Sequence, residues 1–192
     1  MIQELEIEFK NLLTKKEYHE LFDAFNFENI EPIVQENFYF DTADMAIRQK
    51  HAALRIRTKD NSAKITLKTP QDGHLLETNE TIPLKKAKSI IQKGAFTPPK
   101  SILNQLSKEQ VTVEKLQLIG SLKTKRVEKE YHGALLVLDQ SWYGDTVDFE
   151  LELEACDHDF GEELFYNILL NHKIPKRDTP NKIARALNYD PS

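Results

Sequence analysis

Residues 4–10 read Glu-Leu-Glu-Ile-Glu-Phe-Lys, a strict alternation of charged and apolar side chains. A period of two residues is typical of a β-strand, because successive side chains point to opposite faces of a sheet. The same alternation recurs at 53–59, at 64–68 and at 146–155. These stretches therefore predict strands that each have one charged and one apolar face.

Other elements are expected around these strands. Further strands are expected at 37–41, 75–82, near 116–131 and at 134–140. Helices are expected after a capping box of Thr14 and Glu17, between Pro83 and Gly94, from Pro98–Pro99, around Leu164–Leu169 and from Thr179–Pro180. Short turns join most strands, which predicts a mainly antiparallel sheet and the α+β class. No linker or composition break interrupts the chain, so we expect one domain over residues 1–192.

The charged faces are segregated by sign. Strands 4–10 and 148–154 carry almost only carboxylates, and strands 53–59 and 64–68 carry almost only cations. For any single strand, simple solvent exposure is the more common explanation of a charged face. Two carboxylates about 4 Å apart repel by about 4 kcal/mol at an effective dielectric near 20. Such clusters therefore favour bound partners: a polyanion for the cations and a hard divalent cation, Mg²⁺ or Mn²⁺, for the carboxylates.

Eight strands with helices packed on their apolar faces can close into a barrel with a polar lumen. Small barrels usually fill their interior with apolar side chains. A charged lumen makes sense where the barrel binds a highly charged ligand.

Composition excludes several classes of protein. The chain has 192 residues, 40% of them hydrophobic, and a formal net charge of −5. That charge argues against a broad nucleic-acid-binding surface. A single cysteine, Cys156, fits a reducing compartment, and no stretch is apolar enough to span a membrane. We expect a cytoplasmic protein without nucleic-acid or membrane partners. No P-loop and no HxH or HExxH spacing is present.

Six motifs, in family order, resemble the CYTH superfamily, the triphosphate tunnel metalloenzymes. The first is Glu6-Ile7-Glu8-Phe9-Lys10, which matches the ExExK signature. Tyr39-Phe40-Asp41-Thr42 resembles the family's Y-F-D-T segment, and Leu54-Arg55-Ile56-Arg57 resembles its L-R-x-R strand. Thr66-Leu67-Lys68 resembles its T-L-K strand, and Phe149-Glu150-Leu151-Glu152 resembles its V-E-x-E strand. Asn181-Lys182-Ile183-Ala184-Arg185 resembles its C-terminal S-K-x-x-R helix. The chain is most similar to the small single-domain branch of Bacillus-like bacteria, the YjbK-like proteins.

The resemblance implies a closed or nearly closed eight-stranded antiparallel β-barrel with a charged lumen and helices outside. It implies catalytic roles for Glu6, Glu8 and Lys10. It implies phosphate contacts from Lys10, Arg55, Arg57, Lys68, Arg126, Lys182 and Arg185. It implies ligands for Mg²⁺ or Mn²⁺ at Glu6, Glu8, Glu77, Asp139, Glu150 and Glu152. Lys182 and Arg185 would lie on a helix that closes one end of the tunnel.

The chain departs from the family pattern in three places. In the strand that contains Lys123–Arg126 the expected spacing of the cations is blurred, and Arg126 is the best match, since Lys125 would point to the opposite face. The family has an arginine beside the middle-strand glutamate, but the segment His74-Leu75-Leu76-Glu77 has none. Asp139 matches a family acid, yet the alternation places it on one face with Leu135 and Val137.

Family members hydrolyse inorganic triphosphate or thiamine triphosphate, or cyclise ATP. The resemblance therefore implies a metal-dependent triphosphatase, a phosphoanhydride hydrolase that is a monomer or a homodimer. The alternatives are a non-catalytic sensor of nucleotides or polyphosphate and a class IV-type adenylate cyclase. The sequence shows no clear base pocket, because Tyr39, Trp142 and Tyr143 are equally explained by packing. We therefore expect the phosphate tail to supply most of the binding energy.

Overall fold

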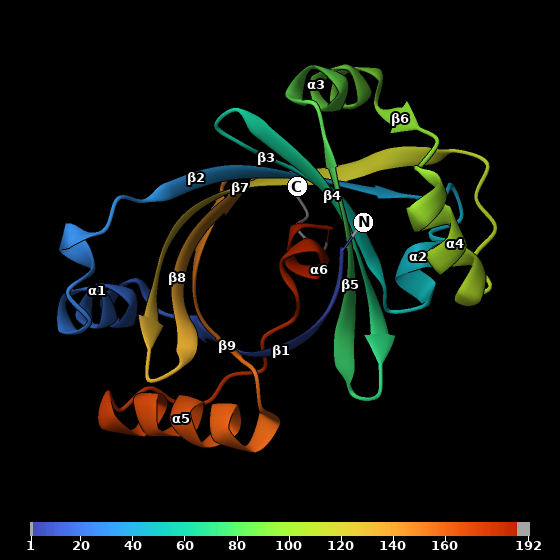
Figure 1. The fold of residues 1–192 in the computed structure, drawn as a ribbon. Helices are drawn as coiled ribbons and strands as arrows, with labels where there is room; N and C mark the ends of the chain where they lie inside the picture. The colour runs from blue at the N-terminus through green and yellow to red at the C-terminus, as the bar shows by residue number, and fades with distance from the viewer. Residues whose placement is uncertain (1, 188–192) are drawn as a thin grey trace.

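The computed structural model describes residues 2–187, which form a ring of strands with helices around it (Figure 1). The strands are β1 (Ile2–Leu13), β2 (Ile33–Asp41), β3 (Ala53–Lys59), β4 (Ser62–Gln71), β5 (His74–Ile82), β6 (Ala95–Phe96), β7 (Leu116–Tyr131), β8 (Ala134–Tyr143) and β9 (Thr146–Ala155). The α-helices are α1 (Lys15–Ala24), α2 (Ala46–Gln49), α3 (Leu84–Lys93), α4 (Lys100–Lys108), α5 (His158–Asn171) and α6 (Lys182–Leu187).

Eight of these strands close into an antiparallel barrel, as the sequence predicts. Their order is β2-β3-β4-β5-β1-β9-β8-β7, and an additional pairing of β2 with β7 closes the ring. The two-residue strand β6 extends the sheet from one end of β7. Because the barrel is closed, the alternation seen in the sequence divides every strand into a lumenal face and an outer face.

Strand β1 changes neighbours in its middle. Residues 2–6 pair with β5, and residues 7–13 pair with β9. The register places Glu8 opposite Glu154 and Lys10 opposite Glu152. Charged residues that are far apart in the sequence therefore meet across one wall of the tunnel.

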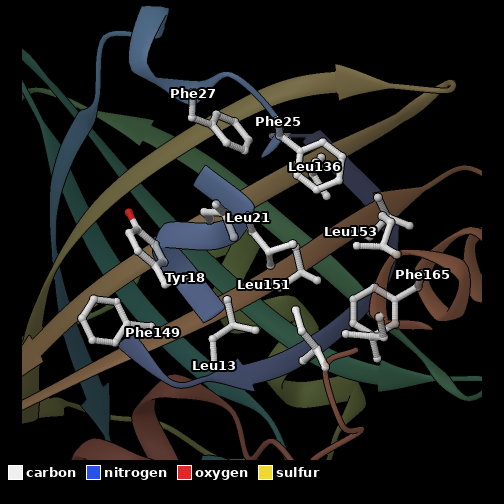
Figure 2. Packing of buried hydrophobic residues seen from close by; sticks show 14 of the residues in the cluster. Leu13, Tyr18, Leu21, Phe25, Phe27, Leu136, Phe149, Leu151, Leu153 and Phe165 are labelled. Atoms are coloured by element: carbon white, nitrogen blue, oxygen red, sulfur yellow. The ribbon is translucent and has the colours of Figure 1, made fainter. Parts of the chain in front are cut away.

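The apolar faces of the strands form two hydrophobic clusters outside the barrel. One lies under α1 and α5, where Leu21, Phe27 and Phe165 are fully buried against β8 and β9 (Figure 2). The other lies under α3 and α4, against β3 and β4. Fully burying a side chain of this size stabilises the fold by about 1.5–3 kcal/mol. The core is therefore outside the ring, which leaves the lumen to polar groups.

A glycine sets how closely α5 approaches the barrel. A Cβ atom at Gly161 would lie 2.6 Å from the Phe9 ring and 2.7 Å from the Cβ atom of Ala155. Both distances are too short for real contacts, so only glycine allows this packing. The helix begins at Asp157, whose side chain accepts a hydrogen bond from the Phe160 N–H at 2.9 Å.

The segment after α5 leads the chain back to the tunnel. Buried Asn11 holds it, because its Nδ2 donates to the Pro175 carbonyl at 3.1 Å and its Oδ1 accepts from the Arg177 N–H at 2.7 Å. Helix α6 then lies within the ring of strands (Figure 1). It packs on β7 at Gly120, where an added Cβ atom would lie only 3.2 Å from the Leu187 side chain.

None of the helices in residues 2–187 combines the length and apolar character that crossing a membrane requires.

Candidate active site

A charged cavity of about 310 Å³ lies inside the barrel. All the site residues predicted from the sequence line it, apart from Arg185. They come from β1, β3, β4, β5, β7, β8, β9 and α6, so closure of the barrel is what brings them together.

Three carboxylates gather at one wall of the cavity. Glu6, Glu8 and Glu154 each offer an oxygen, and these oxygens lie within 4.8 Å of one another. Burial and the nearby carboxylates of Glu152, Glu6 and Glu8 together raise the pKa of Glu154 to about 7, although the charge of Arg126 lowers it. Burial also raises the pKa of Glu6. Burial and crowding therefore oppose full ionisation of these carboxylates, which a bound cation would favour.

Two arginines on the lumenal face of β3 lack sufficient acceptors. The Arg55 Nε is buried and has no hydrogen-bond partner among residues 2–187, and the guanidinium lies 3.9 Å from Glu77. The Arg57 Nε donates to the Asn37 side chain at 2.8 Å. Burial, with the charges of Arg55 and Arg126, lowers the pKa of Arg57 to about 9. An anion between these two side chains would provide the missing acceptors. We call Glu6, Glu8, Glu154, Arg55 and Arg57 the open site.

Two lysines lie beside the open site. Lys68 Nζ lies 2.5 Å from a Glu6 oxygen and 3.1 Å from a Glu77 oxygen. Burial would raise the pKa of Glu77, but the charges of Lys68 and Arg55 outweigh it and hold the value at about 2. Lys10 Nζ lies 3.3 Å from Glu8. These lysines place positive charge between the carboxylates and the arginines.

On the opposite side of the cavity, Asp139, Glu150 and Glu152 each contact two cations. Arg126 binds Asp139 through two hydrogen bonds of 2.8 and 2.7 Å and Glu152 through one of 2.5 Å. Lys182 of α6 lies 3.0 Å from Asp139 and 2.9 Å from Glu150, and it also contacts Glu152. Asp139 and Glu150 have exposed fractions of 0% and 1%, so these ion pairs are shielded from water.

Arg185 extends the same group of ion pairs beyond the cavity. Its Nε lies 2.8 Å from an Asp148 oxygen, and its Nη2 contacts Glu150. Burial raises the pKa of Glu150 to about 7, whereas the charges of Lys182 and Arg126 outweigh burial and lower the pKa of Glu152. These contacts attach α6 to β8 and β9. We call this group the α6 network; its members are Arg126, Asp139, Asp148, Glu150, Glu152, Lys182 and Arg185.

The structure adds one residue to the predicted set. Glu154 continues the alternation of 148–154, but the motif match ended at Glu152. Tertiary pairing makes the distinction, because Glu150 and Glu152 each contact two cations, whereas Glu154 lies 3.8 Å from one, Arg126, and close to the carboxylates of Glu6 and Glu8. Asp139 does share a face with Leu135, which also lines the cavity. The Asp139 carboxylate is buried because it pairs with Arg126, and it does not belong to a separate hydrophobic core.

Comparison with known proteins places the chain in a family. The CYTH domain model matches residues 4–187. A Bacillus subtilis protein named "Putative triphosphatase YjbK" is 42% identical over 186 residues, which are 96% of this chain and 95% of that protein.

Two solved structures share the fold. A Bacillus halodurans protein described as a "putative adenylate cyclase" is 33% identical with a TM-score of 0.90, over 96% of this chain and 98% of that one. The Hippeastrum protein HpAC1 is described as a "putative adenylyl cyclase" that reveals a dominant triphosphatase activity. It is 21% identical with a TM-score of 0.74, over 96% and 95% of the two chains. With the domain match over nearly all its length and a close relative of the same size, the chain belongs to the CYTH family.

Proposed function

We propose that the chain is one CYTH-like domain that hydrolyses a triphosphate with the help of a divalent metal ion. The observation that carries this proposal is the open site, where the buried Arg55 Nε lacks an acceptor within the described residues and three carboxylates, each within 4.0 Å of one cation, crowd within 4.8 Å of one another. A small polyphosphate with a metal ion would supply an acceptor for the arginine and further positive charge for the carboxylates. The 42% identical relative named as a triphosphatase supports the same reaction.

The donor set fits a hard divalent ion. Three carboxylate oxygens within 4.8 Å of one another are the ligand type that Mg²⁺ and Mn²⁺ prefer, and we propose one of these ions. Once bound, the ion supplies a Lewis acid next to the phosphate oxygens. Each of the other predicted ligands, Glu77, Asp139, Glu150 and Glu152, lies within 4.0 Å of two cations among residues 2–187, whereas Glu6, Glu8 and Glu154 each lie that close to one. We therefore propose Glu6, Glu8 and Glu154 first as ligands.

The cations of the site bind and orient the substrate. Arg55 and Arg57 lie two residues apart on one strand face, and each guanidinium can hold a phosphate through two hydrogen bonds. Lys10 and Lys68 hold the phosphate oxygens nearer the carboxylates. Phosphoryl transfer depends mainly on positioning and on stabilisation of charge. The proposed reaction is attack of water on the terminal phosphorus, so no cysteine, serine or histidine nucleophile is required.

Phosphate release from inorganic triphosphate tests this proposal. With Mg²⁺ or Mn²⁺ we expect release by the purified protein, and EDTA should abolish it. Arg55→Met should lose both binding and release, while its melting temperature shows whether the fold persists. Triphosphate binding without release from any triphosphate would overturn hydrolysis and favour the sensor, and pyrophosphate release from ATP would favour the cyclase.

A further inference from the structure

Positive charge is concentrated on one side of the molecule. Residues 81–108, which include α3, β6 and α4, contain no aspartate, glutamate or arginine. The whole chain has a formal net charge of −5, so the rest of it is more acidic still. The charged residues of this segment are all exposed lysines: Lys85, Lys86, Lys88, Lys93, Lys100 and Lys108. Within residues 2–187, no carboxylate lies close enough to form an ion pair with any of them.

An open groove of about 570 Å³ runs along α3 on this side. Its apolar lining includes Ile90 and Phe96, which are buried, and its charged lining consists of exposed lysines. We call it the α3 groove; the residues that define it are Lys85, Lys86, Ile90, Lys93, Ala95 and Phe96. Protein interfaces typically have an apolar centre and a polar rim. The groove therefore suits an occupant that brings apolar and acidic groups together.

Helix α5 carries such a combination on the opposite side of the barrel (Figure 1). Its inner face packs into one hydrophobic cluster, whereas α3 packs into the other. Tyr166 and Leu170 on its outer face have exposed fractions of 48% and 74%. Lys176 borders this face, with its Nζ 5.7 Å from the centre of the Tyr166 ring. We call the exposed residues at helical spacing the α5 face; they are Asp159, Glu162, Glu163, Tyr166 and Leu170.

The α3 groove and the α5 face match in length and in sign. Lys86 to Lys93 and Glu163 to Leu170 are each separated by seven residues of helix, which corresponds to about 10 Å. Because the two surfaces lie on opposite sides of the barrel, the α5 face can reach an α3 groove only on another copy of the chain (Figure 1). An anionic membrane is a poorer match, since it would repel the acidic remainder of the chain.

We propose that copies of this chain associate head to tail, with the α5 face of one copy in the α3 groove of the next. The contact joins two different surfaces, so each added copy leaves one groove and one α5 face free. Ion pairs between exposed groups contribute little individually, so the association should be reversible and weakened by salt. It goes beyond the monomer or homodimer that the family resemblance implies. No residue of either surface lines the charged cavity, so this inference does not rest on the proposed function.

Sedimentation at several protein concentrations gives the first test. At an ionic strength of about 0.01 M, charges act over about 30 Å, and the average mass should rise beyond that of a pair as the concentration increases. At about 1 M, charges act over about 3 Å, and the same concentrations should give a lower average mass. A monomer at every concentration, or a mass that stops at a pair, would overturn the proposal.

Reversal of charge on each surface gives the second test. Lys86→Glu/Lys93→Glu and Glu162→Lys/Glu163→Lys should each stay monomeric, because like charges would then face each other. An equimolar mixture of these two variants should associate again, since the reversed groove of one matches the reversed α5 face of the other. Melting temperatures show that both variants fold, and a mixture of folded variants that stays monomeric would contradict the proposed contact.

Lys50→Glu/Lys115→Glu is the matched control for the groove variant. Both lysines are exposed, and neither lines the α3 groove. This control should associate like the wild-type protein. Loss of association in the control, as large as in Lys86→Glu/Lys93→Glu, would mean that overall charge, and not the groove, governs association.

Vesicles of phosphatidylserine and phosphatidylcholine test the alternative partner, a membrane. We expect the wild-type protein to stay in solution when the vesicles are sedimented. Vesicle binding that Lys86→Glu/Lys93→Glu abolishes would overturn the choice of a second copy as the occupant. Phosphate release from inorganic triphosphate should be unchanged in all of these variants, so a failure of the association can be told apart from a failure of the proposed function.

Discussion

The α6 network and the open site contain the same residue types and differ in how completely their charges are paired. In the α6 network, Lys182 contacts three carboxylates and Arg126 binds two. In the open site, the Arg55 Nε has no hydrogen-bond partner within residues 2–187, and Glu154 lies 3.8 Å from Arg126 while three other carboxylates raise its pKa. Paired buried charges fix the position of an element, whereas unpaired ones need a ligand. The comparison therefore separates residues that hold the tunnel together from residues that we propose bind substrate.

The largest expected effect is on stability in the α6 network. Arg126→Met removes one of the two cations that contact Asp139 and Glu152, which have exposed fractions of 0% and 4%. Breaking a buried ion pair from one side costs about 3–5 kcal/mol. Lys182 still contacts both carboxylates, so we expect a loss at the lower end of that range. Urea denaturation should show this loss of unfolding free energy.

Lys125→Met is the matched control for this substitution. Lys125 is the neighbouring residue of β7 and is exposed on the outer face. An equal loss in both variants would show that the α6 network does not contribute to stability as described.

The next effect is on activity in the open site. Arg57→Lys keeps the charge but loses the two-pronged geometry with which a guanidinium binds phosphate. Loss of one hydrogen bond to a charged group costs about 1.5–3 kcal/mol, so kcat/KM should fall roughly 10- to 100-fold. Steady-state kinetics with inorganic triphosphate measure this. Unchanged kcat/KM would mean that Arg57 acts only through its charge.

The pH dependence of stability tests the environment of Glu154 in the open site. The pKa of Glu154 is about 7 in the folded protein, above its ordinary value of 4.5. The folded state therefore holds a proton that the unfolded state has lost, and the metal-free protein should lose stability as pH rises from about 4.5 towards 7. Thermal melts in metal-free buffer should show a smaller decrease in Glu154→Gln. The same slope in both proteins would contradict this environment for Glu154.

The smallest effects are expected outside both regions. Lys59 lies two residues beyond Arg57 on the same strand but does not line the cavity, and Lys86 is exposed on α3. Lys59→Ala should change kcat/KM by about twofold, and Lys86→Ala should have no measurable effect, as is usual for surface sites. Losses as large as that of Arg57→Lys would indicate general electrostatic attraction instead of a defined phosphate site.

The fold could be predicted from the sequence because its main signals are local. The alternation at residues 4–10 and the capping box of Thr14 and Glu17 both correspond to observed elements. In the capping box, Glu17 N–H donates to Thr14 Oγ1 at 3.2 Å and Thr14 N–H donates to the Glu17 carboxylate at 2.7 Å. Such patterns depend on neighbouring residues alone, so one sequence contains them.

The division of the tunnel into two regions could not be predicted in the same way. Glu150, Glu152 and Glu154 alternate identically along β9 and differ only in what faces them. Lys182 comes from α6, and Glu8 comes from β1 at the other end of the chain. Which carboxylate is paired therefore depends on barrel register and on the docking of α6, neither of which the sequence pattern specifies.

The response of the melting temperature to Mg²⁺ and Mn²⁺ tests the separation of the two regions most directly. A ligand that binds only the folded state raises the melting temperature. The ions should raise it in the wild-type protein and in Glu150→Gln, whose carboxylate belongs to the α6 network, but not in the double variant Glu8→Gln/Glu154→Gln. A full response in the double variant, or a response lost in Glu150→Gln alone, would contradict the placement of the metal at the open site.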